Sequence, residues 1–223
     1  MADKKRTTRA AASAAKRKEA FVVPAKNFGS VAARLPTRFG EFVIKVWPER
    51  RGFEPVALVT PQLDSSKPAL VRVHSECLTG DVFHSRRCDC GSQKDAALKM
   101  IAQSGNGVFI YLRQEGRGIG IYDKIRAYTL QEQGYDTFQA NLLLGHQPDE
   151  RKYDWAKKIL DELGVGKIRL LTNNPAKVRE LTVLGIEVVE RVPVKTGGNR
   201  ENRKYLETKR VKFRHLLGRE DEE

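Results

Sequence analysis

The three cysteines of the chain lie close together in the segment HSECLTGDVFHSRRCDCG, residues 74–91. Cys77, Cys88 and Cys90 form a Cys-x10-Cys-x-Cys pattern, and the same segment contains His74 and His84. An odd number of cysteines leaves one thiol unpaired in any disulfide framework, whereas clustered thiolates are good zinc ligands. The pattern therefore indicates metal binding or catalysis.

The number of thiolates bears on the type of metal site. A structural zinc ion is normally held by four protein ligands, whereas a catalytic zinc ion has three and keeps one position for water, whose pKa it lowers. Three cysteines therefore favour a catalytic zinc site. Two alternatives stay open, since His74 or His84 could be a fourth ligand, or the cysteines could pack without any metal.

Two further segments are typical of phosphate sites. RQEGRGIG, residues 113–120, has three glycines at alternate positions beside Arg113, Glu115 and Arg117; glycine lets the backbone approach phosphate and arginine binds it bidentately. TNNPAK, residues 172–177, puts a proline in the first turn of an expected helix, where free N–H groups favour an anion. A glycine-rich turn without a ligand and a satisfied helix cap are the alternatives.

The expected elements bring these segments to one sheet. Strands are predicted at residues 35–48, 54–60, 70–75, 107–112, 168–171 and 186–194, and helices at 92–105, 122–134, 153–164, 176–185 and 203–217. Strand and helix alternate from residue 92 to 194. The sequence therefore predicts an α/β fold, with a largely parallel sheet flanked by helices and a small β-rich N-terminal region, whose ligands bind beyond the carboxyl ends of strands.

Charge and length limit the class of protein. The 223 residues carry a net charge of +13, of which residues 1–26 contribute +6 from eight basic and two acidic side chains. We expect these residues to be a basic, disordered tail ahead of a catalytic domain at 27–223; a nucleic-acid arm and an organelle transit peptide are the alternatives. No apolar run is long enough to span a membrane and no secretory signal is present, which predicts a cytoplasmic protein.

A zinc ion with one open coordination position, together with phosphate-binding loops, indicates a hydrolase that acts on a nucleotide. Neither the base of that nucleotide nor the bond that is cleaved follows from the spacing of the residues. A nucleic-acid-binding protein with a structural zinc knuckle is the competing hypothesis, because the chain is strongly basic. That hypothesis requires four zinc ligands and salt-sensitive binding.

Eight segments resemble those of GTP cyclohydrolase II, in order and over about residues 33–217: RVHSECLTGD, RCDCG, RQEGRGIG, KIRAY, QGYDT, DERKY, RLLTNNPAKV and YLETK. The resemblance implies an α/β homodimer that holds one zinc ion per subunit and uses Mg²⁺ with the triphosphate. It also implies conversion of GTP to 2,5-diamino-6-hydroxy-4-(5-phosphoribosylamino)pyrimidine, formate and pyrophosphate, the first step of riboflavin biosynthesis, with no nucleic-acid partner.

The resemblance also implies roles for single residues. Cys77, Cys88 and Cys90 match the zinc ligands, Asp149 the proton acceptor and Arg151 the nucleophile. Because a guanidinium is effectively always protonated, electrostatic stabilisation is an equally physical role for Arg151. Tyr128 matches a catalytic position beside the zinc, and the alternative is a core aromatic. The positions that match GTP contacts are Arg72, Val73, His74, Ser75, Glu76, Gln93, Glu115, Gly116, Arg117, Thr137, Thr172 and Lys177.

Overall fold

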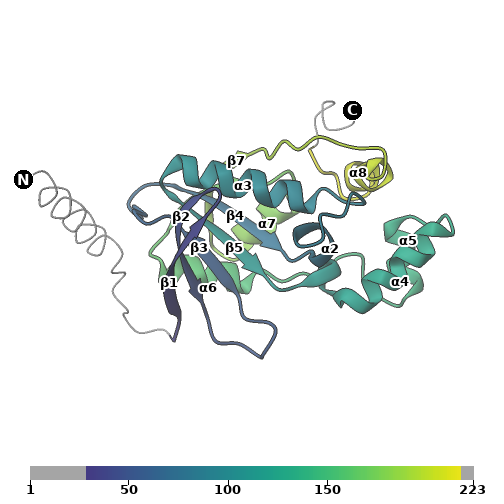
Figure 1. The fold of residues 1–223 in the computed structure, drawn as a ribbon, viewed down its shortest axis with the longest axis horizontal. Helices are drawn as coiled ribbons and strands as arrows, with labels where there is room; N and C mark the ends of the chain where they lie inside the picture. Colours follow the sequence, from purple (N-terminus) through teal and green to yellow (C-terminus); the bar gives the residue numbers. More distant parts are fainter. Residues whose placement is uncertain (1–28, 217–223) are drawn as a thin grey trace, which may run out of the picture.

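The computed structural model describes residues 29–216, so the predicted tail at 1–26 lies outside the described residues. One seven-stranded sheet, in the order β1-β2-β3-β5-β4-β6-β7, forms the centre of the molecule (Figure 1). Its strands are β1 (Val31–Thr37), β2 (Gly40–Val46), β3 (Val56–Val59), β4 (Ala69–Ser75), β5 (Gly107–Leu112), β6 (Lys167–Leu171) and β7 (Glu187–Val192).

The sheet is parallel on one side and antiparallel on the other. Strand β4 pairs in parallel with β5 and β6, and β6 pairs in parallel with β7. Strands β1, β2 and β3 are antiparallel and join the sheet through the antiparallel pairing of β3 with β5. The α/β prediction is confirmed, and the β-rich N-terminal region continues the same sheet.

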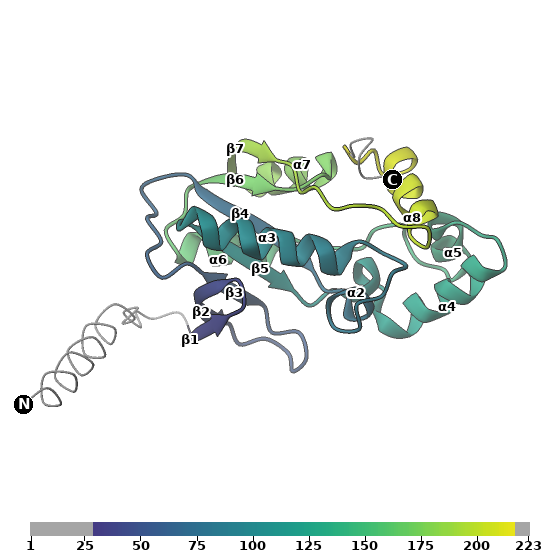
Figure 2. The ribbon, with the colours of Figure 1, turned by 45° about the horizontal axis from the view of Figure 1, so that its top comes forward.

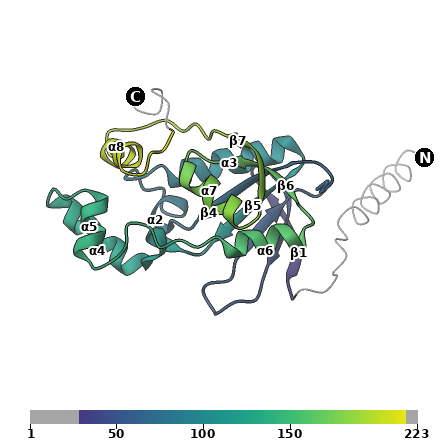
Figure 3. The ribbon, with the colours of Figure 1, turned by 180° about the vertical axis from the view of Figure 1, so that it is seen from behind.

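Helices cover both faces of the sheet. The helical elements are α2 (Leu78–Asp81), α3 (Cys90–Ser104), the 3-10 helix η1 (Glu115–Gly118), α4 (Gly120–Glu132), α5 (Thr137–Leu143), α6 (Asp154–Glu162), α7 (Pro175–Val183) and α8 (Arg203–Val211). Helix α3 lies on one face, and α6 and α7 lie on the other (Figures 1 and 3). Helices α4, α5 and α8 gather at one end of the sheet, beyond α2 (Figure 2). No helix within 29–216 is long and apolar enough to cross a membrane.

Strand β4 divides its side chains between two cores. Val71 and Val73 pack with Ile159 and Leu181 in the larger cluster, on the side of α6 and α7. Leu70 packs with α3 in the smaller cluster. Because side chains alternate along a strand, Arg72 and His74 share the α3 face with Leu70. Both polar side chains are buried there.

The structure differs from the predicted elements in several places, and the short elements α2 and η1 are among those that were not predicted. The stretch expected as one strand at 35–48 contains a turn, in which the Thr37 hydroxyl accepts from the Phe39 N–H and donates to the Gly40 carbonyl. Helix α5 was not predicted, although Asp136 and Gln139 form its capping box. The last helix ends at Val211, and Arg214 reverses the chain with a φ of 53°.

We predict that Ile110→Ala destabilises the protein by about 2–5 kcal/mol, because its fully buried side chain would leave a cavity in the central sheet. Val183→Ala is the control, since Val183 on α7 is 86% exposed and its loss should change stability by less than about 0.5 kcal/mol. Urea unfolding of both variants checks the expectation, and equal midpoints would contradict it.

Candidate active site

A pocket lies beyond the carboxyl ends of β4, β5 and β6, the place where parallel sheets bind ligands. The segments that follow these three strands all contribute to it. Its lining residues are Arg72, His74, Ser75, Glu76, Cys77, Arg87, Cys88, Cys90, Gln93, Glu115, Gly116, Arg117, Ile119, Lys124, Ala127, Tyr128, Gln131, Thr137, Asn141, Arg151, Asn174, Lys177, Tyr205, Lys209, Phe213 and His215. Three separate parts of the sequence, the cysteine segment, the glycine-rich loop and the C-terminal segment, therefore meet in one cavity.

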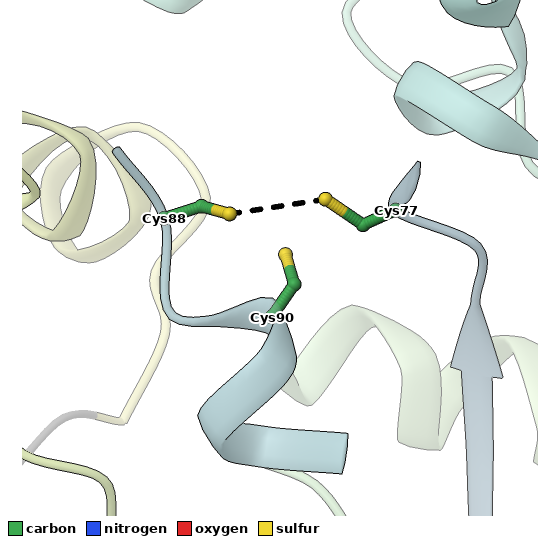
Figure 4. Close-up of side chains that lie close together, drawn as sticks. All are labelled: Cys77, Cys88 and Cys90. Atoms are coloured by element: carbon green, nitrogen blue, oxygen red, sulfur yellow. Dashed lines mark hydrogen bonds between the residues drawn. The ribbon is translucent and has the colours of Figure 1, made fainter. Parts of the chain in front are cut away.

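The three cysteines point toward one another (Figure 4). Cys77 follows β4 and Cys90 begins α3, and the sulfur atoms of Cys77, Cys88 and Cys90 all lie within 4.8 Å of one another. The Cys77 and Cys88 sulfurs are 3.8 Å apart. Tetrahedral zinc with Zn–S bonds of about 2.3 Å requires sulfurs about 3.8 Å apart, so the cluster fits a zinc ion.

The described part of the chain offers the three sulfurs no fourth ligand. Within residues 29–216, no histidine or carboxylate joins the three-cysteine group. The His74 ring instead contacts the Asp81 carboxylate at 3.0 Å, and His84 is exposed outside the pocket. The closed-site alternative and the zinc-knuckle hypothesis both require a fourth ligand, so this geometry favours a site with an open position.

Close packing holds the cysteine segments in place. A Cβ atom on Gly80 would lie 2.9 Å from the Cys88 sulfur and 3.2 Å from the Cys77 sulfur, which only glycine avoids. The buried Asp81 carboxylate accepts from the Cys77 N–H at 3.0 Å and from the Tyr111 hydroxyl at 3.2 Å. Helix α2 therefore holds Cys77 close to the first residues of α3.

Lys124 brings a positive charge to the thiols. Its ammonium donates to the Cys77 sulfur at 3.2 Å and to Glu115 Oε1 at 2.8 Å. Hydrogen bonds from the Cys88 and Cys90 thiols lower the pKa of Cys77, whereas the hydrogen bond to Cys77 raises the pKa of Cys88 to about 11. Burial opposes the charge on Lys124, but the Cys77 thiolate and Glu115 outweigh it and raise the pKa of Lys124. The thiolate and the ammonium stabilise each other.

Two buried basic side chains, Arg72 and Lys177, and the half-buried Arg117 have no anionic partner within residues 29–216. Arg72 donates to the Leu171 carbonyl at 3.0 Å, Lys177 donates to the Val73 carbonyl at 2.8 Å, and the Arg117 guanidinium lies 4.0 Å from the centre of the Phe213 ring. The structure gives none of the three a carboxylate partner within the described part of the chain, and Arg72 Nε and Arg117 Nη1 are buried without a hydrogen bond. Uncompensated buried charge is unfavourable, so this end of the pocket suits a polyanion.

Burial and neighbouring charges together set the pKa values of the basic groups Lys177 and Arg151. Burial and then the charges of Arg72 and Arg151 bring the pKa of Lys177 well below its ordinary value. Burial alone would lower the pKa of Arg151, but the hydrogen bond and charge of Asp149 raise it. Arg151 Nε donates to Asp149 Oδ1 at 2.7 Å, and Arg151 is therefore a cation whose countercharge is already supplied.

Most predicted contact residues line the pocket. The Ser75 hydroxyl accepts from Gln114, and Glu76 lies 3.6 Å from the Arg113 guanidinium. The Gln93 side chain accepts from Arg72 at 2.7 Å and donates to Asp89 at 2.6 Å. Gly116 and Arg117 both have positive φ angles, a turn that favours glycine and strains arginine. Glu115 and Thr137 complete the group.

Three predicted residues do not line the pocket. The Val73 side chain is in the core, and only its carbonyl reaches the site, through Lys177. The buried Thr172 hydroxyl accepts from the Asn174 N–H at 3.0 Å, which makes a turn at the end of β6. Asp149 is exposed and contacts the site through Arg151. Asn174 caps α7, as the helix-cap alternative for this segment predicts.

Several lining residues were not predicted, and a signal existed for some. Lys124 lies in KIRAY, and Tyr205 and Lys209 lie in YLETK, so basic or aromatic residues within the matching segments were candidates. Phe213 and His215 carried no such signal, because only the reversal at Arg214 brings them back to the pocket.

Comparison with known proteins assigns the family. A family model described as GTP cyclohydrolase II matches residues 29–193. The chain belongs to the GTP cyclohydrolase II family. The GTP cyclohydrolase-2 of Azotobacter vinelandii is 54% identical over 188 residues, which are 84% of this chain and 90% of that protein. Those of Acinetobacter baylyi and Neisseria meningitidis are 51% and 50% identical, over 85% and 83% of this chain and 96% and 94% of their own lengths.

A solved structure is also similar, titled RibBX, a two domain 3,4-dihydroxy-2-butanone 4-phosphate synthase from A. baumannii. Its TM-score is 0.42 at 16% identity, and the match covers 77% of this chain and 42% of that one. The GTP cyclohydrolase II family model ends at residue 193, so α8 and the pocket residues that follow it lie beyond the matched range.

For this GTP cyclohydrolase II family member we predict that Cys88→Ser lowers bound zinc from about one ion per chain, because a serine hydroxyl does not supply a thiolate. His84→Ala is the matched control in the same segment, and it should keep its zinc. Metal analysis after dialysis measures both. Full zinc in Cys88→Ser would refute the site, and zinc loss in His84→Ala would restore the closed-site alternative.

Proposed function

We propose that the protein is a zinc-dependent GTP cyclohydrolase II, which converts GTP to 2,5-diamino-6-hydroxy-4-(5-phosphoribosylamino)pyrimidine, formate and pyrophosphate. This is the first step of riboflavin biosynthesis. One observation carries the proposal: a single pocket combines a three-thiol cluster with buried cations that lack an anion. A nucleoside triphosphate supplies the missing negative charge, and Mg²⁺ accompanies it. The name shared by the curated relatives supports the same activity.

The basic end of the pocket binds the triphosphate. Arg72 and Arg117 each have a buried N–H that finds no partner in the described residues, and Lys177 is held in place by the Val73 carbonyl. Phosphate oxygens accept from such groups and remove the unfavourable burial of their charge. The remaining proposed nucleotide contacts are His74, Ser75, Glu76, Gln93, Glu115, Gly116 and Thr137, together with the backbone near Val73 and Thr172.

The thiolate end of the pocket holds the metal. When bound by Cys77, Cys88 and Cys90, a zinc ion supplies Lewis acidity and a water of lowered pKa. Lys124 keeps the Cys77 thiolate charged, and Glu115 fixes that ammonium from the opposite side. Glu115 also accepts from the Leu78 N–H at 2.5 Å, which ties the glycine-rich loop to the cysteine segment.

Tyr128 is the proposed proton donor for ring opening. Water adds at C8 of the guanine, the imidazole ring opens, and a second hydrolysis releases formate, so a ring nitrogen must gain a proton. Burial raises the pKa of Tyr128, which keeps its phenol protonated at neutral pH. Its hydroxyl lies 3.4 Å from the Thr79 hydroxyl, and the Arg87 guanidinium lies 4.3 Å from its ring centre. These contacts orient a neutral donor beside the cysteines.

Arg151 is proposed to assist release of pyrophosphate by electrostatic stabilisation. Its pKa is raised by Asp149, so the guanidinium stays charged and is a poor nucleophile. A fixed cation stabilises negative charge that develops during cleavage between the α- and β-phosphorus atoms. Asp149 would then orient Arg151, and its pairing with that cation makes it a weak proton acceptor.

We further propose that the enzyme works as a homodimer in the cytoplasm, with residues 27–223 as its catalytic domain. The family model supports a catalytic domain over its matched residues 29–193, and the resemblance to the family supports the homodimer and the compartment.

We predict that the zinc-loaded chain releases formate and pyrophosphate from GTP in the presence of Mg²⁺. Chelation should stop formate release, because the three thiolates alone provide no Lewis acid, and added zinc should restore it. Coupled assays for both products measure the reaction. A fully metallated protein that leaves GTP unchanged would refute the proposed function.

We predict that Tyr128→Phe lowers formate release on the order of a hundredfold, because the ring loses its proton donor but keeps its packing. Pyrophosphate release should fall less, so a formylated intermediate accumulates and mass spectrometry detects it. Tyr122→Phe on the same helix is the control, since Tyr122 is 77% exposed. An unchanged ratio and rate of formate to pyrophosphate would leave Tyr128 with a packing role only.

A further inference from the structure

The C-terminal segment, residues 202–216, forms one wall of the pocket although it lies beyond the residues that match the family model. Helix α8 packs beside α5 at the open end of the sheet. After the reversal at Arg214, the His215 N–H donates to the Lys209 carbonyl at 3.0 Å and the Leu216 N–H donates to the Asn173 carbonyl at 2.8 Å. The end of the segment is therefore held against α8 and against the loop that follows β6.

A buried ion pair fixes this segment to the cysteines. The Lys209 ammonium contacts the Asp89 carboxylate, and both side chains are at least nine-tenths buried. Asp89 lies between Cys88 and Cys90 and also accepts from Gln93, which in turn accepts from Arg72. A charge pair in such surroundings holds its partners in one geometry, because separation would leave an unpaired buried charge. Lys209 thus positions the C-terminal segment relative to the cysteine segment.

The His215 side chain faces a group of cations. Its Nδ1 is buried and has no hydrogen-bond partner among residues 29–216. Burial and then the charges of Lys209, Arg117, Arg151 and Lys177 lower the pKa of His215 to about 3. Arg117 Nη1 in the same pocket is also unpartnered, and stacking on Phe213 fixes the plane of that guanidinium. Arg72 Nε and His74 Nδ1 are also without a hydrogen bond in this pocket. Buried polar atoms are nearly always bonded, so these unpartnered nitrogens mark a place for ligand oxygens.

We propose that His215 is a further substrate-binding residue, which contacts phosphate oxygens of the nucleotide beside Arg117. This inference rests on the proposed function, because it assigns the anion that enters the pocket to the triphosphate of GTP. Phosphate oxygens bound among these cations accept hydrogen bonds from both His215 Nδ1 and Arg117 Nη1. The last residues of the described chain are then part of the substrate site, and Lys209 is the positioning residue that brings them there.

The test compares three variants of the zinc-loaded full chain. His215→Ala removes the contact, His215→Asn keeps an amide N–H near the position of Nδ1, and Lys212→Ala removes an exposed charge from the same segment. Calorimetry measures binding of inorganic triphosphate, and steady-state kinetics measure KM and kcat for GTP. Thermal melting confirms that each variant folds.

We expect His215→Ala to weaken triphosphate binding about tenfold and to raise KM for GTP by a similar factor, with a smaller change in kcat. His215→Asn should recover part of the loss, and Lys212→Ala should change both quantities less than about twofold. Unchanged triphosphate affinity in His215→Ala, or an equal loss in Lys212→Ala, would overturn the inference. If the wild-type chain binds triphosphate but leaves GTP intact, the proposed reaction fails while the comparison of variants still decides the role of His215.

Discussion

Burial of β4 on both faces is the constraint on which the site depends. The strand lies between two parallel neighbours and between helices on either side, so every residue from Ala69 to His74 is buried. Polar side chains in such a strand must find partners inside the protein. Arg72 finds them on β6 and α3, and His74 finds Asp81 on α2. These hydrogen bonds offset the cost of burying the two polar side chains, and they also fix β6, α3 and α2 around the pocket.

The pocket separates two kinds of charge. Thiolate character gathers where β4 meets α3, with Lys124 as its local counterion, whereas cations without carboxylate partners gather near the ends of β5 and β6. Asp89 stands between the two groups, because it neighbours two cysteines in sequence and carries the ion pair with Lys209. A substrate that is anionic at one end and attacked by water at the other matches this division.

Local patterns predicted much of the fold and of the site. The cysteine spacing was sufficient to suggest a metal cluster because Cys88 and Cys90 are only two residues apart and Cys77 lies in the same short segment. Apolar runs located the parallel strands, since burial on both faces makes them continuous in sequence. The matching segments also placed Lys177, Glu115 and Arg117 in the same cavity.

What sequence could not predict depends on contacts between distant residues or on single turns. Lys209 and Asp89 are 120 positions apart, and nothing near either residue indicates the other. Val73 and Thr172 match contact positions, yet neither side chain lines the pocket. The pleat of β4 turns the Val73 side chain into the core, and the Thr172 hydroxyl is used in the turn that follows β6. The turn after Thr37 depends on one hydroxyl and the short helix α5 on one capping box. In a sequence, such single residues are weaker signals of structure than a periodic pattern of apolar residues.

The strand order also determines when the site can assemble during synthesis. Strand β4 is synthesised early, but its two neighbours in the sheet end at residues 112 and 171. The strand therefore cannot pair on both sides until residue 171 has been synthesised. Non-local pairing of this kind delays folding, because loop closure precedes the stabilising contacts. A nascent chain that ends before Lys209 already has all three thiols, but the Asp89 carboxylate beside them has no counterion. The contacts between the cysteine segment and α8 therefore form only after Lys209 has been synthesised.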